Sequence, residues 1–167
     1  MAFTMNKEYT KEYRMFQLSF EACQQRIEKL RYSIEKNSYL FPLNSEKLKN
    51  FGQDEEESLD AFILRYSQCV SIIQEQLFRG IALLEQENIN DKSNRDKTLL
   101  MEKLGAIQSA EDFGSAAMLR NKFAHNYPEQ SAVRMERMNL IMEEAKFVLA
   151  TFRDIHSYLV KKKFIVE

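Results

Sequence analysis

The sequence predicts an all-α fold, a helical bundle of four to five helices that run up and down. Only 4 glycines and 2 prolines occur among 167 residues, too few turn-forming residues to connect many strands. Apolar residues recur at steps of three and four along most of the chain. Capping residues followed three positions later by an acid mark the starts of two of the segments. We expect a single domain over residues 1–167, large enough to bury about 70% of its unfolded surface.

An additional N-terminal helix is expected over residues 6–36, before a core at 54–160. Its apolar residues alternate steps of three and four, which is the 3.5-residue period of a coiled-coil or bundle seam. The members of this stripe are Tyr13, Phe16, Phe20, Cys23, Ile27, Leu30 and Ile34. Residues 39–43 interrupt the pattern and begin a connection with a short turn near 45–51.

The second helix is expected to begin at Asp54, with Glu57 as its capping partner, and to continue as one helix to about residue 85. Residues 88–94 are polar and rich in asparagine, and they are predicted to form a loop. A short third helix over 98–106 should stop near Gly105.

The fourth helix should begin at Ser109, which has the character of an N-cap. It should end near His125 or Asn126, because Pro128 disfavours the α conformation at Tyr127. The fifth helix is expected to run from after Pro128 towards residue 159.

Composition limits the possible functions. The 24 basic and 25 acidic residues give a net charge of -1, so any RNA site must be a local patch. Cys23 and Cys69 lie on apolar helical faces and are expected to be buried, and no Cys/His spacing is typical of zinc. His156 continues the apolar stripe of the last helix, so we expect it to be buried and hydrogen-bonded. Without an apolar span or a secretion signal, a cytoplasmic location and no membrane association are expected.

The end of the fourth helix concentrates groups that can act chemically: Arg120, Asn121, His125 and Tyr127. Arg120 and His125 are five positions apart, which places them ~140° apart around an unbroken helix. A loosened last turn, or a second copy of the chain, would bring the two groups together. As an alternative, Arg120, Lys122 and His125 are simply cations that complement the negative end of the helix dipole.

The pattern Arg120-Asn121, three residues, then His125-Asn126-Tyr127 resembles the motif of the HEPN superfamily. The tyrosine two residues after the histidine resembles the toxins of HEPN/minimal-nucleotidyltransferase toxin–antitoxin pairs. The resemblance covers about residue 54 to the C-terminus and is sharp only over 120–127. It implies a HEPN-like bundle and a metal-independent ribonuclease that needs no cofactor and is restrained by a cognate minimal nucleotidyltransferase antitoxin.

The same resemblance implies further roles. Tyr127 would be the residue to which the partner attaches AMP; alternatively, it is an ordinary loop aromatic. Asp60 and Arg65 resemble polar residues at matching places in related proteins and are candidates for a groove. Alternatively, both residues are simply charged side chains exposed to solvent.

The chemistry of RNA cleavage fits these residues. RNA carries its own nucleophile, the 2′-hydroxyl, from which His125 can remove the proton. The planar guanidinium of Arg120 can stabilise the charge that develops on the phosphorus oxygens, and Asn121 can orient the ribose or the histidine ring. No carboxylate cluster has the spacing of a magnesium nuclease, so no metal ligands are assigned.

Two classes of function remain open: a HEPN ribonuclease toxin, and a non-catalytic adaptor or substrate-binding partner of a separately encoded nucleotidyltransferase. A two-fold homodimer, in which the two motifs face a shared groove, is also expected. It is suggested by the narrow stripe of the first helix and by the ~140° between Arg120 and His125.

Overall fold

The computed structural model describes the backbone of residues 7–125 and 131–165, and the side chains of residues 11–124 and 132–165. In these ranges the chain is helical and contains no strand. The long elements are α1 (Lys7–Asn37), α3 (Gln53–Ile72), α6 (Ala110–His125) and α7 (Ser131–Lys161). A π-helix, η2 (Ile73–Leu77), joins α3 to α4 (Phe78–Leu84). The short elements are η1 (Ser38–Leu40), α2 (Ser45–Lys49) and α5 (Asn94–Leu104). The all-α prediction is confirmed.

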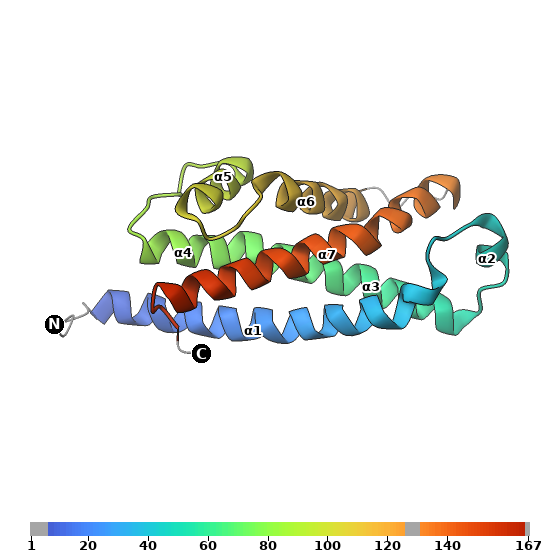
Figure 1. Cartoon of the computed structure of the whole chain (residues 1–167), viewed down its shortest axis with the longest axis horizontal. Helices are drawn as coiled ribbons and strands as arrows, with labels where there is room; N and C mark the ends of the chain where they lie inside the picture. Colours follow the sequence, from blue (N-terminus) through green and yellow to red (C-terminus); the bar gives the residue numbers. More distant parts are fainter. Residues whose placement is uncertain (1–6, 126–130, 166–167) are drawn as a thin grey trace.

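The long helices lie side by side and alternate in direction along the chain (Figure 1). Helix α1 packs against α3 and α7, while α6 packs against α7 and α3. The short helix α2 lies at one end of the bundle, and α5 lies near the other end, beside the start of α6 (Figure 1). The chain is therefore a helical bundle, as its sequence predicts.

The apolar stripe of α1 is covered by the chain's own helices. Its central residues are buried in the main core: Phe16, Phe20, Cys23, Ile27 and Leu30. The approach of α1 to α4 is close, because a Cβ added at Gly80 would lie 2.0 Å from Cδ2 of Phe16. Since this stripe is used within the chain, it no longer supports the expectation of a dimer.

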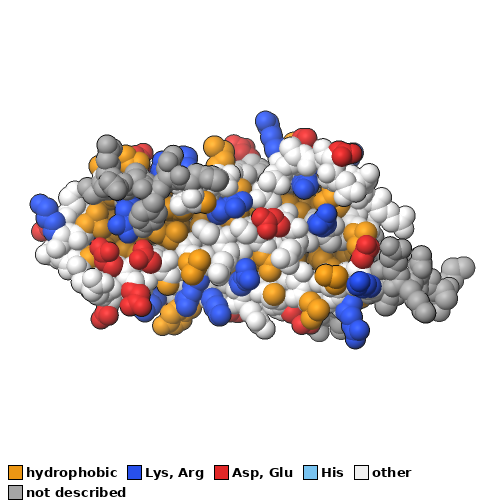
Figure 2. All heavy atoms as spheres, turned by 180° about the vertical axis from the view of Figure 1, so that it is seen from behind, with side chains coloured by type: hydrophobic (Ala, Val, Ile, Leu, Met, Phe, Trp, Pro, Cys, Tyr) orange, Lys and Arg blue, Asp and Glu red, His pale blue; other side chains and the backbone are white. Residues whose placement is uncertain are grey.

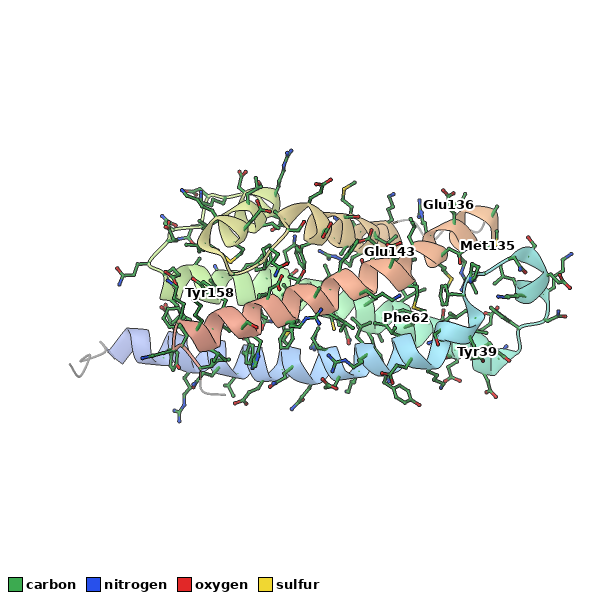
Figure 3. The ribbon with its side chains drawn as sticks, viewed as in Figure 1. Tyr39, Phe62, Met135, Glu136, Glu143 and Tyr158 are labelled. Atoms are coloured by element: carbon green, nitrogen blue, oxygen red, sulfur yellow. The ribbon has the colours of Figure 1, made fainter. Side chains whose placement is uncertain are left out.

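The core continues to the α2 end of the bundle. Figure 3 marks Phe62, which is fully buried between the helices, and Tyr39, which is 72% exposed in η1, just after α1. A smaller apolar cluster there consists of Leu40, Leu43, Leu59 and Met138. Asn139 of α7 holds this connection in place: its Oδ1 accepts from the Leu43 N–H at 2.6 Å and its Nδ2 donates to the Leu43 carbonyl at 3.0 Å.

The start of α3 corrects one prediction. The N-cap is Gly52 rather than Asp54, and the Gly52 N–H donates to the Glu55 carboxylate at 3.0 Å. Gly52 with Glu55 and Asp54 with Glu57 both have the spacing of three residues that a capping pair needs. Starting the helix at the earlier pair adds backbone hydrogen bonds to it. Asp54, Glu55 and Glu56 then lie in the first turn, where acids suit the positive end of the helix. Figure 2 shows acidic side chains gathered at this end of the bundle.

The other helix boundaries follow the predictions more closely. The hydroxyl of Ser109 accepts from the Asp112 N–H, which confirms Ser109 as the N-cap of α6. Gly105 has a φ of 84° and ends α5, as predicted. Helix α5 begins at Asn94, four residues before the predicted start, because Ser93 caps it by accepting from the Asp96 N–H.

Both cysteines are fully buried, as predicted, and burial raises their pKa values, that of Cys69 to about 12. The prediction for His156 is wrong. Its side chain is only partly buried, and its ring stacks on Phe20 with 5.8 Å between the ring centroids. No hydrogen bond to it occurs within the part of the chain that the structure describes. None of the described helices combines the length and the apolar character needed to cross a bilayer.

Candidate functional site

Helix α6 carries Arg120, Asn121 and His125, and it remains helical through His125. The last turn does not loosen before that residue, so Arg120 and His125 are ~140° apart around the helix axis. The side chain of His125 and all of Tyr127 lie outside the described residues. Of the four motif residues, only Arg120 and Asn121 therefore have side chains within the described ranges.

Arg120 points towards another element of the bundle. Its Nη2 donates to the amide oxygen of Gln74 at 3.0 Å, and Gln74 is only 6% exposed. The Nε of Arg120 is buried and has no hydrogen-bond partner among the described residues. Within those residues no carboxylate forms an ion pair with it. The guanidinium is thus held by a neutral group, and none of the described acids forms an ion pair with it.

The C-terminal end of α6 receives its cation from a different helix. Nη1 of Arg137, on α7, donates to the carbonyl of Lys122 at 3.3 Å. A cation that donates to a carbonyl at this place suits the negative end of the helix. Arg120 does not do this, because its hydrogen bond goes to Gln74. The alternative, that Arg120, Lys122 and His125 are cations that complement the negative end of the helix dipole, stays a prediction, because an interaction with the dipole does not require a hydrogen bond to the helix end.

Gln74 belongs to the π-helix η2, which was not expected. The sequence predicted one continuous α-helix here, and although Gln74 has the polarity of a groove residue, nothing in its spacing assigned it a partner. The backbone shows the wider turn directly, since the Phe78 N–H donates to the carbonyl of Ile73, five residues earlier. Single π turns inside α-helices are frequent at functional sites.

Further contacts hold α6 in place on either side of Arg120. The hydroxyl of Tyr66 donates to the Ala116 carbonyl at 2.5 Å, and the ring of Phe123 meets Tyr66 edge-on, with 6.5 Å between the centroids. Ser115 donates to Glu144 of α7 at 2.6 Å. Burial raises the pKa of Tyr66 well above its usual value, and the nearby Glu144 adds to this. The phenol therefore stays protonated and keeps its hydrogen bond.

The outer surface of α6 has a different character. Met118 is 63% exposed, and Asn121 is also exposed. His125 follows Met118 by seven residues and so occupies the same stripe of the helix. Leu140 of α7, which is 48% exposed, lies between Arg137 and Glu144, the residues of α7 that contact Lys122 and Ser115 of α6. Arg120 faces inward, and the position of His125 belongs to this outer stripe.

Asp60 and Arg65 have structural partners elsewhere. Asp60 is an exposed acid that forms an ion pair with Arg134 at 3.7 Å. Arg65 faces α1, where it donates to the Ser33 hydroxyl at 2.9 Å and lies over the ring of Tyr32. Neither has a described contact with Arg120, so the structure does not bring these candidates together with the motif.

Two of the hollows in the described surface lie away from the motif, and neither is lined by it. One, of about 420 Å³, lies between α1 and α7 and includes His156. The other, of about 640 Å³, lies between α1 and the η2–α4 segment and includes Gln76 and Arg79. On the face shown in Figure 2, lysines and arginines are interspersed with acids, and no continuous basic surface spans the bundle. A nucleic-acid contact on that face would have to be local.

The arrangement offers a guanidinium that is held by a neutral amide and forms no described ion pair, and such a group is suited to an anionic oxygen of a ligand. Across the described ranges, no group of three or more histidine, cysteine, aspartate or glutamate residues is placed to hold a metal ion. No protein-family model, no curated protein and no solved structure matches this chain.

Proposed function

We propose that this chain is a metal-independent ribonuclease of the HEPN type and the toxin of a toxin–antitoxin pair. The observation that carries the proposal is the state of Arg120. Its guanidinium is held by the neutral Gln74 amide at 3.0 Å, and no described acid pairs with it. A partly buried arginine without a paired carboxylate is costly for the fold and is suited to meeting negative charge from a ligand. The resemblance of residues 120–127 to the HEPN motif supplies the kind of ligand, an RNA phosphate.

The proposed reaction uses only groups of the chain and of RNA. His125 takes the proton from the 2′-hydroxyl, and the 2′-oxygen forms a bond to the adjacent phosphorus. The bond from phosphorus to the 5′-oxygen breaks, and that oxygen leaves as a hydroxyl after it takes a proton from water. The products are a 2′,3′-cyclic phosphate, or the 3′-phosphate into which water opens it, and a 5′-hydroxyl. Arg120 stabilises the charge on the phosphorus oxygens, and Asn121 orients the ribose or the histidine ring.

We further propose that a second copy of the chain completes the site. Arg120 and His125 occupy faces ~140° apart on an unbroken helix, which favours pairing the arginine of one copy with the histidine of another. The exposed Met118 and Leu140 adjoin the stripe that holds His125 and give this contact an apolar centre. Met118→Glu should convert a dimer into a monomer in light scattering and lower cleavage. Leu18→Glu, at a residue that is 62% exposed on α1, is the matched control.

The cognate partner is proposed to be a minimal nucleotidyltransferase that attaches AMP to Tyr127. The phenol oxygen would bond to the α-phosphorus of ATP, pyrophosphate would leave, and the phenol proton would pass to water. The added phosphate would bring negative charge and bulk to the motif, and its oxygens would occupy the Arg120 guanidinium and stop cleavage.

The experiment is cleavage of a labelled RNA by purified protein in excess EDTA. Arg120→Ala should lose on the order of a hundred- to thousandfold in rate, because the arginine meets charge that is complete only in the transition state. Arg120→Lys should recover little, since an ammonium cannot reproduce two parallel hydrogen bonds. His125→Ala should lose roughly 10²–10⁴-fold. Lys122→Ala, an exposed cation of the same helix, is the control and should cleave normally.

A second substrate tests the nucleophile. An oligonucleotide with a single 2′-deoxy sugar at the cut site should remain intact. Cleavage that stops in EDTA, or that continues through the deoxy position, would refute the mechanism. If the wild-type chain cleaves no cellular RNA and the wild type and motif variants grow equally, the adaptor function replaces the ribonuclease.

A further inference from the structure

The π turn η2 is placed where the bundle meets the motif. It interrupts an otherwise continuous helix from Gln53 to Leu84, and Gln74 lies in its first turn. The Gln74 side chain is 6% exposed, and its amide oxygen is the described acceptor for the Arg120 guanidinium. A π turn sacrifices regular helical hydrogen bonding, and such turns cluster at functional sites. The contact therefore combines an irregular backbone with a polar pair in which the glutamine is buried and the arginine is partly buried.

The chemical identity of Gln74 is informative. Arginine has only donors, so its partner must present an oxygen, and glutamine does this without carrying charge. A glutamate would hold the guanidinium as well or better, but as an ion pair it would neutralise part of the charge. A methionine would fill the same space and release the arginine from its orientation. Among these three residues, only glutamine both orients the guanidinium and leaves its charge available.

We infer that Gln74 is a positioning residue for Arg120, and that the π turn presents it for this task. The inference rests on the proposed ribonuclease function of Arg120. The amide fixes the plane of the guanidinium, and the unpaired charge is kept for the anionic oxygens of the RNA phosphate. Pre-orientation of this kind increases rate because the donor is already in place when charge develops.

The first test compares Gln74→Glu with Gln76→Glu. Both substitutions add one negative charge to the same π turn, but Gln76 is exposed and does not contact Arg120. Gln74→Glu should lower kcat about tenfold to a hundredfold, while KM changes by no more than about twofold. Gln76→Glu should cleave at close to the wild-type rate. A role that is only structural would move the melting temperature and the amount of folded protein, not kcat at constant KM.

The second test uses chemical rescue and does not depend on the folding of the glutamate variant. Added guanidinium ion should restore part of the activity of Arg120→Gly by occupying the space of the lost side chain. In Arg120→Gly combined with Gln74→Met, this rescue should disappear, because the ion no longer has an acceptor to orient it. Gln76→Met in the same background should leave the rescue unchanged.

The outcomes separate the inference from the proposed function. Equal kcat for Gln74→Glu and Gln76→Glu, with Arg120→Ala inactive, would overturn the role of Gln74 and leave the ribonuclease in place. Rescue that persists with Gln74→Met would do the same. A wild-type chain that cleaves no more RNA than Arg120→Ala would overturn both.

Discussion

The close approach of α4 to α1 gives a sharp prediction about stability. A Cβ at Gly80 would lie 2.0, 2.6 and 2.9 Å from three ring atoms of Phe16, whose side chain is only 4% exposed. Overfilling a packed core costs roughly 1–3 kcal/mol, and three contacts this short favour the upper end. Alanine returns about 1 kcal/mol of helix propensity. Gly80→Ala should therefore destabilise the fold by about 2 kcal/mol.

Gly114 provides the matched control within a helix. A Cβ there would meet nothing within 4 Å, so Gly114→Ala should keep the full gain of about 1 kcal/mol. For a chain of this size, each kcal/mol moves the melting temperature by about 2–4 °C. We expect Gly80→Ala to melt about 4–8 °C lower than the wild type and Gly114→Ala about 2–4 °C higher.

Thermal melting followed by circular dichroism, with urea titration as a second measure, tests both shifts. A double variant adds a direct check. In a Phe16→Leu background Gly80→Ala should cost at least about 1 kcal/mol less, because the ring that it meets is gone. Shifts of the same sign for the two glycines, or no coupling to Phe16, would show that the steric reasoning is wrong.

Further outcomes follow from other contacts. Burial raises the pKa of Cys69 from 9.0 to about 12, so the folded state favours the neutral thiol. This part of the stability is present below about pH 9 and is lost as the pH rises towards 12, and Cys69→Ala should flatten the alkaline fall of the melting temperature. Ellman's reagent should label Cys23 and Cys69 only after unfolding, and rapid labelling of the native protein would contradict their burial. Asn139→Ala removes both hydrogen bonds to Leu43 and should cost about 2 kcal/mol in urea titration, and a change below about 0.5 kcal/mol would show that this link is dispensable. Co-expression with the partner nucleotidyltransferase should add the mass of AMP to the wild type but not to Tyr127→Phe, and an adduct that persists in this variant would reassign the modified residue.

Much of the fold was predictable from the sequence, because its helices are long and strongly periodic. The predicted first helix at 6–36 corresponds to α1 at Lys7–Asn37, and Gly105 ended α5 where a left-handed residue was needed. The missed boundary at Gly52 has a local cause, since two overlapping pairs of residues both satisfy the capping spacing. Such a choice depends on hydrogen bonds that composition does not reveal.

The candidate site was predictable only in part. The sequence singled out Arg120, but its partner Gln74 is 46 positions away along the chain and is placed by a backbone irregularity. The periodicity of apolar residues does not predict a π turn as short as five residues. His156 shows the reverse error: its spacing places it on the apolar stripe, yet its side chain lines a hollow and is only partly buried. Periodicity identifies a face of a helix and does not tell how deeply that face is covered.

The π turn also changes which face of the helix points towards each neighbour, because it rotates the part after it (α4) about the helix axis relative to the part before it (α3). Upstream of it, Tyr66 faces α6, whereas downstream Gly80 must face Phe16 on α1. Deleting one residue within Ile73–Leu77 would turn the downstream half by about 100° relative to the upstream half. A regular α-helix of that length could then keep either the contact of Tyr66 with α6 or the close packing of Gly80 against Phe16 of α1, but not both. The extra residue of the π turn lets one continuous helix form both contacts, although they lie on faces that a regular helix would not align.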